Sequence, residues 1–128
     1  MSIQNVVKVS ENVVGKDVKN LAEENLGEIK EVMLDKVSGK VAYVVLESGT
    51  FLGMGGKLFA IPWSSLNYDV TEECFRLNVD KEKIKTAPGF DKDNWPDMSD
   101  RTWGQSIFDF YGLSPYWSNE SALNEIGA

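Results

Sequence analysis

Residues 48–63 have the sequence SGTFLGMGGKLFAIPW, and this stretch indicates how the rest of the chain folds. Four of the eight residues from position 49 to position 56 are glycines. Glycine loses more conformational freedom on folding than other residues, so this density indicates a turn that needs positive φ or a close backbone approach. The apolar run from Leu58 to Pro62 then predicts a strand, which should end at Pro62 because proline cannot donate to a ladder. The stretch therefore predicts a β-hairpin.

The other β-rich segments are short and follow one another closely. Strands are predicted at residues 6–9, 13–18, 26–34, 41–46 and 75–79. In segment 26–34 the apolar residues change phase, which predicts a β-bulge near Lys30-Glu31. Segment 41–46 is apolar on both faces and should be a buried strand. Because no helix is placed to make a crossover, the sequence predicts a mainly β fold with a small antiparallel barrel or sandwich. Closure into a strongly bent barrel would explain the bulge and the glycines.

The predicted strands end before Asp80, and helical patterns follow it. This residue is a suitable N-cap for a short helix over residues 81–85. A second helix is predicted from Ser99 or Asp100 to about Tyr111, because apolar residues recur there at helical spacing. The C-terminal part therefore predicts one or two short helices.

Aromatic residues are concentrated in this C-terminal part. Eight of the 14 aromatics lie between positions 90 and 117. Disordered tails are poor in aromatics, so this segment should be packed, either on its own barrel or on a neighbouring chain. The expected organisation is a β domain over residues 1–80, an aromatic-rich extension over residues 81–117 and a flexible tail over residues 118–128.

Charge and composition limit the classes of partner. The formal net charge is −7, which disfavours binding to nucleic acid and to anionic membranes. No apolar run approaches the roughly 20 residues of a membrane helix, and the N-terminus lacks the pattern of a signal peptide. Cys74 is the sole cysteine and is predicted to be a buried structural thiol in a reducing compartment. We therefore expect a cytoplasmic protein that neither binds nucleic acid nor inserts into a membrane.

Several motifs follow one another in a fixed order. They are VGKDV at residues 14–18, LGEI at 26–29, VMLD at 32–35 with SGKV at 38–41, FLGMGGK at 51–57 and AIPW at 60–63. In this order and spacing they resemble the PRC-barrel domain, over residues 6–80. This family is named for the cytoplasmic domain of the photosynthetic reaction-centre H subunit, and it includes the C-terminal domain of a bacterial ribosome-maturation factor. The resemblance implies a small, strongly bent β-barrel used for binding or assembly, with no common catalytic residues.

Residues 87–96 resemble the extension carried by free-standing bacterial members of the family. The sequence shows neither the membrane helix that precedes the barrel in the reaction-centre branch nor the separate N-terminal barrel of the ribosomal branch. We therefore expect neither of these two roles to transfer, and the chain resembles the stand-alone branch.

Two sets of residues are candidates for an interaction surface. Phe51, Leu52 and Met54 would form an apolar patch if they point outward, or part of a barrel corner if they fold back on the core. The first possibility predicts that the glycine turn is buried in a homo-oligomer. The second set comprises aromatic residues of the extension: Trp95, Trp103, Phe108, Phe110, Tyr111, Tyr116 and Trp117. The charges among them are mainly acidic, so packing or subunit contact is expected rather than base stacking.

The sequence contains no clear catalytic or metal-binding pattern. Asp91 and Asp93 resemble the start of a calcium loop, but Trp95 and Pro96 replace a ligand and the glycine, and no glutamate closes the loop. No histidine is present to activate Cys74 as a nucleophile. We expect no enzymatic activity, no cofactor and no metal.

The sequence therefore predicts a non-enzymatic PRC-barrel protein that acts as a protein–protein interaction or assembly module and forms a homo-oligomer, either a dimer or a larger assembly. One alternative is a small-molecule or metal-binding module that uses the barrel mouth and the aromatic tail. Another is an RNA-processing or ribosome-associated factor. Oligomer mass, thermal shift with ligands and retention on RNA distinguish the three.

Overall fold

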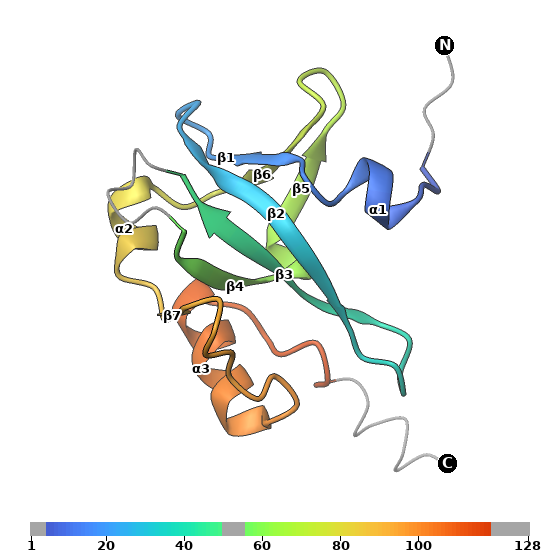
Figure 1. Ribbon diagram of the computed structural model, residues 1–128, viewed down its shortest axis with the longest axis vertical. Helices are drawn as coiled ribbons and strands as arrows, with labels where there is room; N and C mark the ends of the chain where they lie inside the picture. Colours follow the sequence, from blue (N-terminus) through green and yellow to red (C-terminus); the bar gives the residue numbers. More distant parts are fainter. Residues whose placement is uncertain (1–4, 50–55, 119–128) are drawn as a thin grey trace.

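The computed structural model describes residues 5–49 and 56–118 of the chain (Figure 1). The predicted contact residues Phe51, Leu52 and Met54 lie outside these ranges. The elements are, in chain order, α1 (Val9–Asn12), β1 (Asp17–Lys19), β2 (Asn25–Leu34), β3 (Val41–Ser48), β4 (Leu58–Pro62), the 3₁₀ helix η2 (Trp63–Ser65), β5 (Leu66–Asp69), β6 (Cys74–Leu77), α2 (Lys81–Lys85), β7 (Gly89–Phe90) and α3 (Arg101–Tyr111).

Seven strands form one sheet in the order β5-β6-β1-β2-β3-β4-β7. Strands β2, β3 and β4 are antiparallel neighbours, and the register between β2 and β3 shifts between Ile29 and Glu31, which confirms the predicted bulge. However, β1 pairs antiparallel with β2 and parallel with β6, where Val18 lies opposite Phe75. The prediction of a purely antiparallel sheet is therefore wrong at this pair. No crossover helix is needed, because β2 to β5 carry the chain from β1 to β6.

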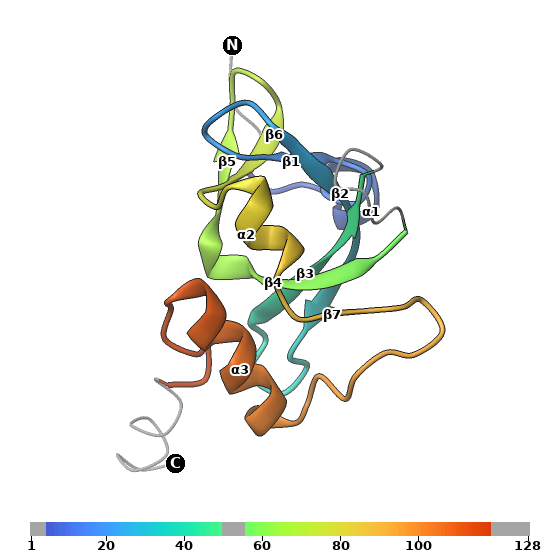
Figure 2. The same ribbon diagram turned by 90° about the vertical axis from the view of Figure 1, so that its left-hand side faces the viewer.

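The sheet is rolled, but hydrogen bonds do not close it in the part of the chain that the structure describes, where β5 and β7 are its edges. η2 is only three residues long and joins β4 to β5. These are the sixth and the first strand in the sheet order, so the sheet must roll to bring them together. Figure 2 shows α2 on the side of the roll next to β5, and Ile84 of α2 is buried in the core. The predicted closed barrel is thus corrected to an open, rolled sheet. The two sides of the roll are joined by the chain itself at η2 and not by hydrogen bonds between β4 and β5.

Two apolar clusters lie on opposite faces of β3 and β4. The side chains that these strands direct into the roll belong to the main core: Val44, Leu46, Phe59 and Ile61. On the outer face, the strands and α3 share a second cluster built around Ala42, Tyr43, Ala60, Ile107 and Phe108. The prediction that segment 41–46 is buried on both faces is confirmed. Figure 1 shows α3 below the sheet. Burial of the Phe108 side chain between them stabilises the folded protein by about 1.5–3 kcal/mol.

The N-terminal part of the chain differs from its prediction. Residues 6–9 are predicted as a strand, but residues 5–8 belong to no helix or strand and α1 begins at Val9. β-branched residues favour a strand only where a neighbouring strand pairs with them, and β1 is already paired with β2 and β6 on its two sides. The predicted strand at 13–18 is likewise reduced to β1, while Val13 is buried in the main core.

The predicted helix ends are confirmed. The Asp80 carboxylate accepts a hydrogen bond from the backbone N–H of Lys83 at 2.8 Å, and that of Asp100 accepts one from Thr102 at 2.9 Å. These bonds satisfy donors that have no partner inside the first turn of a helix. Gly112 follows α3 with a φ of +68°, the left-handed conformation that commonly ends a helix.

Candidate functional site

Aromatic side chains gather where η2 leads into β5. The ring centroid of Phe75 on β6 lies 5.1 Å from that of Tyr68 and 6.0 Å from that of Trp63. Phe75 is buried, whereas Trp63 is 37% exposed and Tyr68 is 46% exposed. Val70, which follows β5, is 51% exposed. We call Trp63, Tyr68 and Val70 the β5 edge surface.

The β5 edge surface lies beside an unpaired strand edge. β5 pairs with β6 from Leu66↔Leu77 to Asp69↔Cys74 without a shift in register. Within residues 5–49 and 56–118, no strand pairs with the other side of β5. β5 contains no lysine, no proline and no bulge, which are three of the devices that commonly block an exposed edge. The opposite edge strand, β7, has only two residues. β5 is therefore the edge better suited to accept a further strand.

Arg76 fixes the hairpin of β5 and β6 to the turn between β1 and β2. Its Nε donates to Oδ2 of Asp69 at 3.0 Å, and its Nη1 donates to the backbone oxygen of Asn20 at 3.0 Å. Its Nη2 lies 3.1 Å from Oε1 of Glu23, and the Arg76 side chain is only 11% exposed. A hydrogen bond from the backbone of Glu72 and the one from Arg76 lower the pKa of Asp69. The orientation of the β5 edge is thus held by a charged network.

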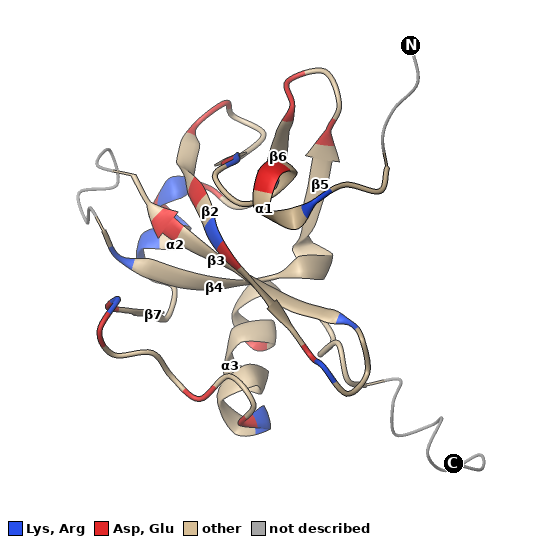
Figure 3. Cartoon of the chain, turned by 45° about the vertical axis from the view of Figure 1, so that its right-hand side comes forward, with Lys and Arg blue, Asp and Glu red and all other residues tan. Residues whose placement is uncertain are grey.

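The tip of this hairpin is acidic. Asp69 ends β5, and the exposed residues Glu72 and Glu73 follow in the loop (Figure 3). Arg76 offsets the charge of Asp69 but not that of the loop. Because charge complementarity favours some partners over others, this surface favours a partner with basic rather than acidic groups.

The aromatic residues of the C-terminal part lie on the protein's own sheet. Trp103 packs edge-on against Tyr43 with ring centroids 5.5 Å apart. Trp117 packs against Phe108 at 5.6 Å. Tyr116 contacts both Tyr43 and Phe108, and its hydroxyl donates to Asp35 Oδ2 at 2.9 Å. These residues belong to or pack against the cluster between α3 and the sheet.

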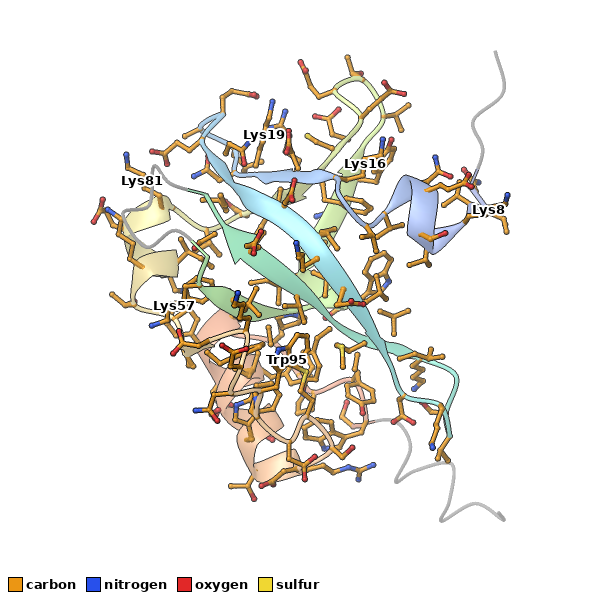
Figure 4. All side chains as sticks on the ribbon, viewed as in Figure 1. Lys8, Lys16, Lys19, Lys57, Lys81 and Trp95 are labelled. Atoms are coloured by element: carbon orange, nitrogen blue, oxygen red, sulfur yellow. The ribbon has the colours of Figure 1, made fainter. Side chains whose placement is uncertain are left out.

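The other predicted contact residues are spread over the molecule. Phe110 and Tyr111 are partly buried and pack against the main core, and Tyr111 also packs against the cluster between α3 and the sheet. Trp95 lies on Phe90 of β7, with ring centroids 5.1 Å apart, and is 39% exposed (Figure 4). The structure therefore brings Trp103, Trp117 and their neighbours together and places Trp95 near the β7 edge.

Tyr43 and Tyr111 have buried hydroxyl groups for which the described residues provide no hydrogen-bond partner. Burial raises the pKa of both groups above the ordinary tyrosine value, because it disfavours the charged phenolate. A buried hydroxyl without a partner costs free energy. The rings of Tyr43 and Tyr111 therefore contribute to packing, while their unpartnered hydroxyl groups reduce the stability of the fold.

Cys74 is a free, buried thiol, as predicted. Burial raises its pKa, which disfavours the reactive thiolate. Among the described residues, no three His, Cys, Asp or Glu side chains gather as a metal site would require. In the segment that begins like a calcium loop, Asp97 Oδ1 instead accepts a hydrogen bond from the backbone of Ser99 at 3.0 Å.

An open hollow lies along the outer face of α3. Its lining side chains are mainly polar: Arg101, Thr102, Gln105, Ser106, Asp109 and Trp117. Gln105 Nε2 donates to Asp109 Oδ1 at 2.9 Å, so two of these groups satisfy each other.

Sequence reasoning missed the β5 edge surface. Residues 66–69 have the alternation of a half-buried strand, and four residues separate them from β6, which suits a hairpin. The loop lacks glycine, and Glu73 takes the left-handed conformation with a φ of +52°. The usual turn signal is therefore absent, and the alternation alone could have identified β5.

No helix in the described ranges is long and apolar enough to cross a membrane. A search of curated proteins found no match. A comparison with known protein families matched residues 9–84, which is 76 of the 128 residues, with the PRC-barrel domain. The matched segment runs from α1 into α2 and includes the rolled sheet except β7. From the order of its motifs, its rolled sheet and this match, we conclude that the chain belongs to the PRC-barrel family.

Proposed function

We propose that this PRC-barrel protein is an assembly module that acts through protein–protein contacts and forms homo-oligomers, with the β5 edge surface as a contact. The main supporting observation is that Trp63 and Tyr68 are 37% and 46% exposed beside an unpaired strand edge. Tryptophan and tyrosine are frequent anchors of protein interfaces. A free edge also offers backbone donors and acceptors to an added strand.

The surroundings of this surface support the proposal, because they keep it ordered before binding. Tyr68 and Trp63 rest on the buried ring of Phe75. Arg76 ties the hairpin to a neighbouring turn through Asp69, Asn20 and Glu23. A surface that is already ordered loses less side-chain and backbone freedom on association.

Sedimentation velocity over a range of protein concentrations tests the proposal. The wild-type chain should gain mass with concentration, and the double variant Trp63→Gln with Tyr68→Gln should remain a monomer. Val37→Gln is the control, since Val37 is 92% exposed in the turn between β2 and β3, and it should associate like wild type. A wild-type chain that is monomeric at every concentration contradicts self-association. A double variant that associates normally contradicts the role of the β5 edge surface.

The glycine turn remains a separate predicted contact. Leu52→Asp in the same assay tests it, because a carboxylate at an apolar interface should weaken association. Sedimentation identical to wild type at all concentrations contradicts a role for Phe51, Leu52 and Met54.

We further propose that the protein has no catalytic activity and works in the cytoplasm. In support, the sequence has no histidine, and its sole cysteine is a free, buried thiol with a raised pKa. Turnover of a simple ester or phosphoester by the purified chain would contradict the first statement. Recovery of the native protein outside the cytoplasmic fraction would contradict the second.

A further inference from the structure

The fold leaves two β-rich segments without a strand partner in the part of the chain that the structure describes. The first is the outer edge of β5, which carries Tyr68. The second is residues 5–8, with the sequence Asn-Val-Val-Lys, which precede α1. Val6 is 96% exposed and Val7 is 36% exposed, and α1 itself contains no buried residue. Residues 6–8, which are part of the strand predicted at residues 6–9, therefore lie at the surface without a sheet to join.

The two segments match in length and side-chain pattern. β5 has four residues, and so does the segment from Asn5 to Lys8. Successive side chains of a strand point to opposite faces. If Val7 lies on the face of Tyr68, Lys8 therefore lies on the face of Asp69, whichever direction the added strand takes. Val7 would then contact an exposed aromatic ring, a favourable cross-strand pair. Lys8 would lie directly opposite Asp69 in a parallel addition, and opposite Asn67, on the same face as Asp69, in an antiparallel one.

Charge complementarity also favours this pairing. The exposed residues Glu72 and Glu73 make the end of the β5 hairpin acidic. The Lys8 side chain is 75% exposed and points away from the sheet (Figure 4). Lys8 Nζ lies 3.6 Å from Glu11 Oε1, but both side chains are exposed, so this pair competes only weakly. A parallel pairing of two β5 strands would instead bring the acidic tips of two hairpins together.

We propose that residues 5–8 of one copy add as a further strand to the free edge of β5 in a second copy. This inference rests on the proposed function, because it names the segment that the β5 edge surface binds. The two copies contribute different segments to each contact. Two copies can therefore close into a dimer by exchanging segments, or continue head to tail.

The anchoring of α1 favours a second copy over the segment's own chain. The backbone N–H of Val13 donates to the carbonyl of Val9 at 3.1 Å, and that of Gly15 donates to the carbonyl of Ile29 at 2.7 Å. These bonds hold the end of α1 near β2, and β1 and β6 lie between β2 and β5 in the sheet order. In Figure 1, α1 begins at its end farther from the sheet. With α1 intact, contact of residues 5–8 with a second copy is therefore favoured over contact with their own β5.

Single-site variants of the full chain test the proposal by sedimentation velocity. Val7→Asp would place a carboxylate next to the acidic hairpin and should weaken self-association by more than about tenfold. Lys8→Glu should act in the same direction. Val37→Asp is the matched control, because Val37 is 92% exposed in the turn between β2 and β3, and it should associate like wild type. Val7 contributes nothing to the core, so the variant should fold.

A mixing experiment separates this contact from a β5–β5 contact. Tyr68→Asp damages the accepting edge, and Val7→Asp damages the added segment. Each variant alone should be a monomer at a concentration where wild type associates. An equimolar mixture should form a heterodimer, because the intact segment of the Tyr68→Asp chain meets the intact β5 of the Val7→Asp chain. A mixture that stays monomeric overturns the inference.

Hydrogen exchange provides a second readout. The backbone amides of β5 should exchange more slowly on association of the wild type and should not change in Val7→Asp. Protection that depends on Val7 but not on concentration would mean that the segment binds its own chain, and would overturn the inference. If Val7→Asp associates like wild type while Tyr68→Asp does not, the inference fails and the proposed function stands. A wild-type chain that never associates overturns the proposed function itself.

Discussion

The hydroxyl oxygen of Tyr43 lies so close to Gly104 of α3 that a Cβ added at this glycine would be 2.7 Å from it. The same Cβ would be 2.8 Å from the Cη2 atom of Trp117. Cβ contacts under 3.0 Å essentially do not occur, and both neighbours belong to packed rings rather than to flexible chain ends. The absence of a side chain at position 104 therefore allows α3 to approach β3 closely.

We expect Gly104→Ala to lower the free energy of unfolding by about 1–3 kcal/mol, the usual effect of overpacking. This loss should exceed the gain of about 1 kcal/mol from the higher helix propensity of alanine. Equilibrium denaturation measures both effects together. Thr102→Ala, on the exposed side of α3, is the control and should change stability little. A Gly104→Ala chain as stable as wild type would show that α3 can move away without loss.

Adding Tyr43→Phe to Gly104→Ala should recover part of the lost stability, because it removes the atom nearest to the new Cβ. Tyr43→Phe alone should leave stability unchanged or raise it. Its hydroxyl is buried, and the described residues offer it no hydrogen-bond partner. A marked destabilisation by Tyr43→Phe would indicate that the hydroxyl has a partner after all, such as a bound water.

Arg76→Lys should destabilise the β5–β6 hairpin. A lysine ammonium is a single point charge and cannot reproduce the fork that reaches Asp69, Asn20 and Glu23 together. The midpoint of thermal unfolding should fall by several degrees, and the amides of β5 should exchange faster. Lys30→Ala is the control, because Lys30 is 52% exposed in its pair with Glu47 and should contribute little. If Arg76→Lys and Lys30→Ala lowered the unfolding midpoint equally, the Arg76 network would stabilise the hairpin no more than an exposed ion pair does.

Asp69 should make stability depend on pH in the acid range. Its pKa in the folded protein is lowered from 3.8, first by the hydrogen bond from the backbone of Glu72 and then by that from Arg76. A lowered folded-state pKa stabilises the protein above the unfolded-state value, and this contribution is lost as the pH falls through the folded-state pKa. The stability difference between wild type and Asp69→Asn should therefore be constant above about pH 5 and shrink below about pH 4. A difference that does not change down to pH 2 would contradict this assignment.

Cys74 should react with a thiol reagent only when the chain opens. The thiol is buried and its pKa is raised, so the thiolate is both inaccessible and scarce in the folded protein. At pH 8 the reaction should be slow in buffer and fast in guanidinium chloride. Lys36→Cys in a Cys74→Ser background supplies an exposed control thiol, which should react rapidly in both solvents. Equal rates for Cys74 in the two solvents would contradict its burial.

The meander of β2, β3 and β4 could be predicted from the sequence because each strand pairs with its neighbour along the chain. The phase change near Ile29 indicated the bulge, and Pro62 indicated the end of β4. Asp80 and Asp100 could likewise be recognised as helix caps, since a cap bonds to residues close by. These features depend on local interactions, which a single sequence records.

The parallel pair of β1 and β6 could not be predicted in this way, because Val18 and Phe75 are 57 positions apart and share no local pattern. The exposure of Trp63 and Tyr68 was missed for a related reason. It follows from the position of β5 at the edge of the sheet, and that position depends on the order of all seven strands. The same residues in a central strand would be buried.

The pairing of β1 with β6 also has a consequence for the order of folding. Bringing Val18 to Phe75 closes a loop of 57 residues, and the entropy cost of loop closure grows with loop length. The β2–β3–β4 meander closes much shorter loops, so we expect it to form in the transition state and β1 to join β6 afterwards. Val45→Ala should then mainly slow folding, whereas Phe75→Ala, on β6, should mainly speed unfolding, as stopped-flow kinetics would show. The hairpin that carries the β5 edge would accordingly be the last part of the sheet to form during folding and the first to separate during unfolding.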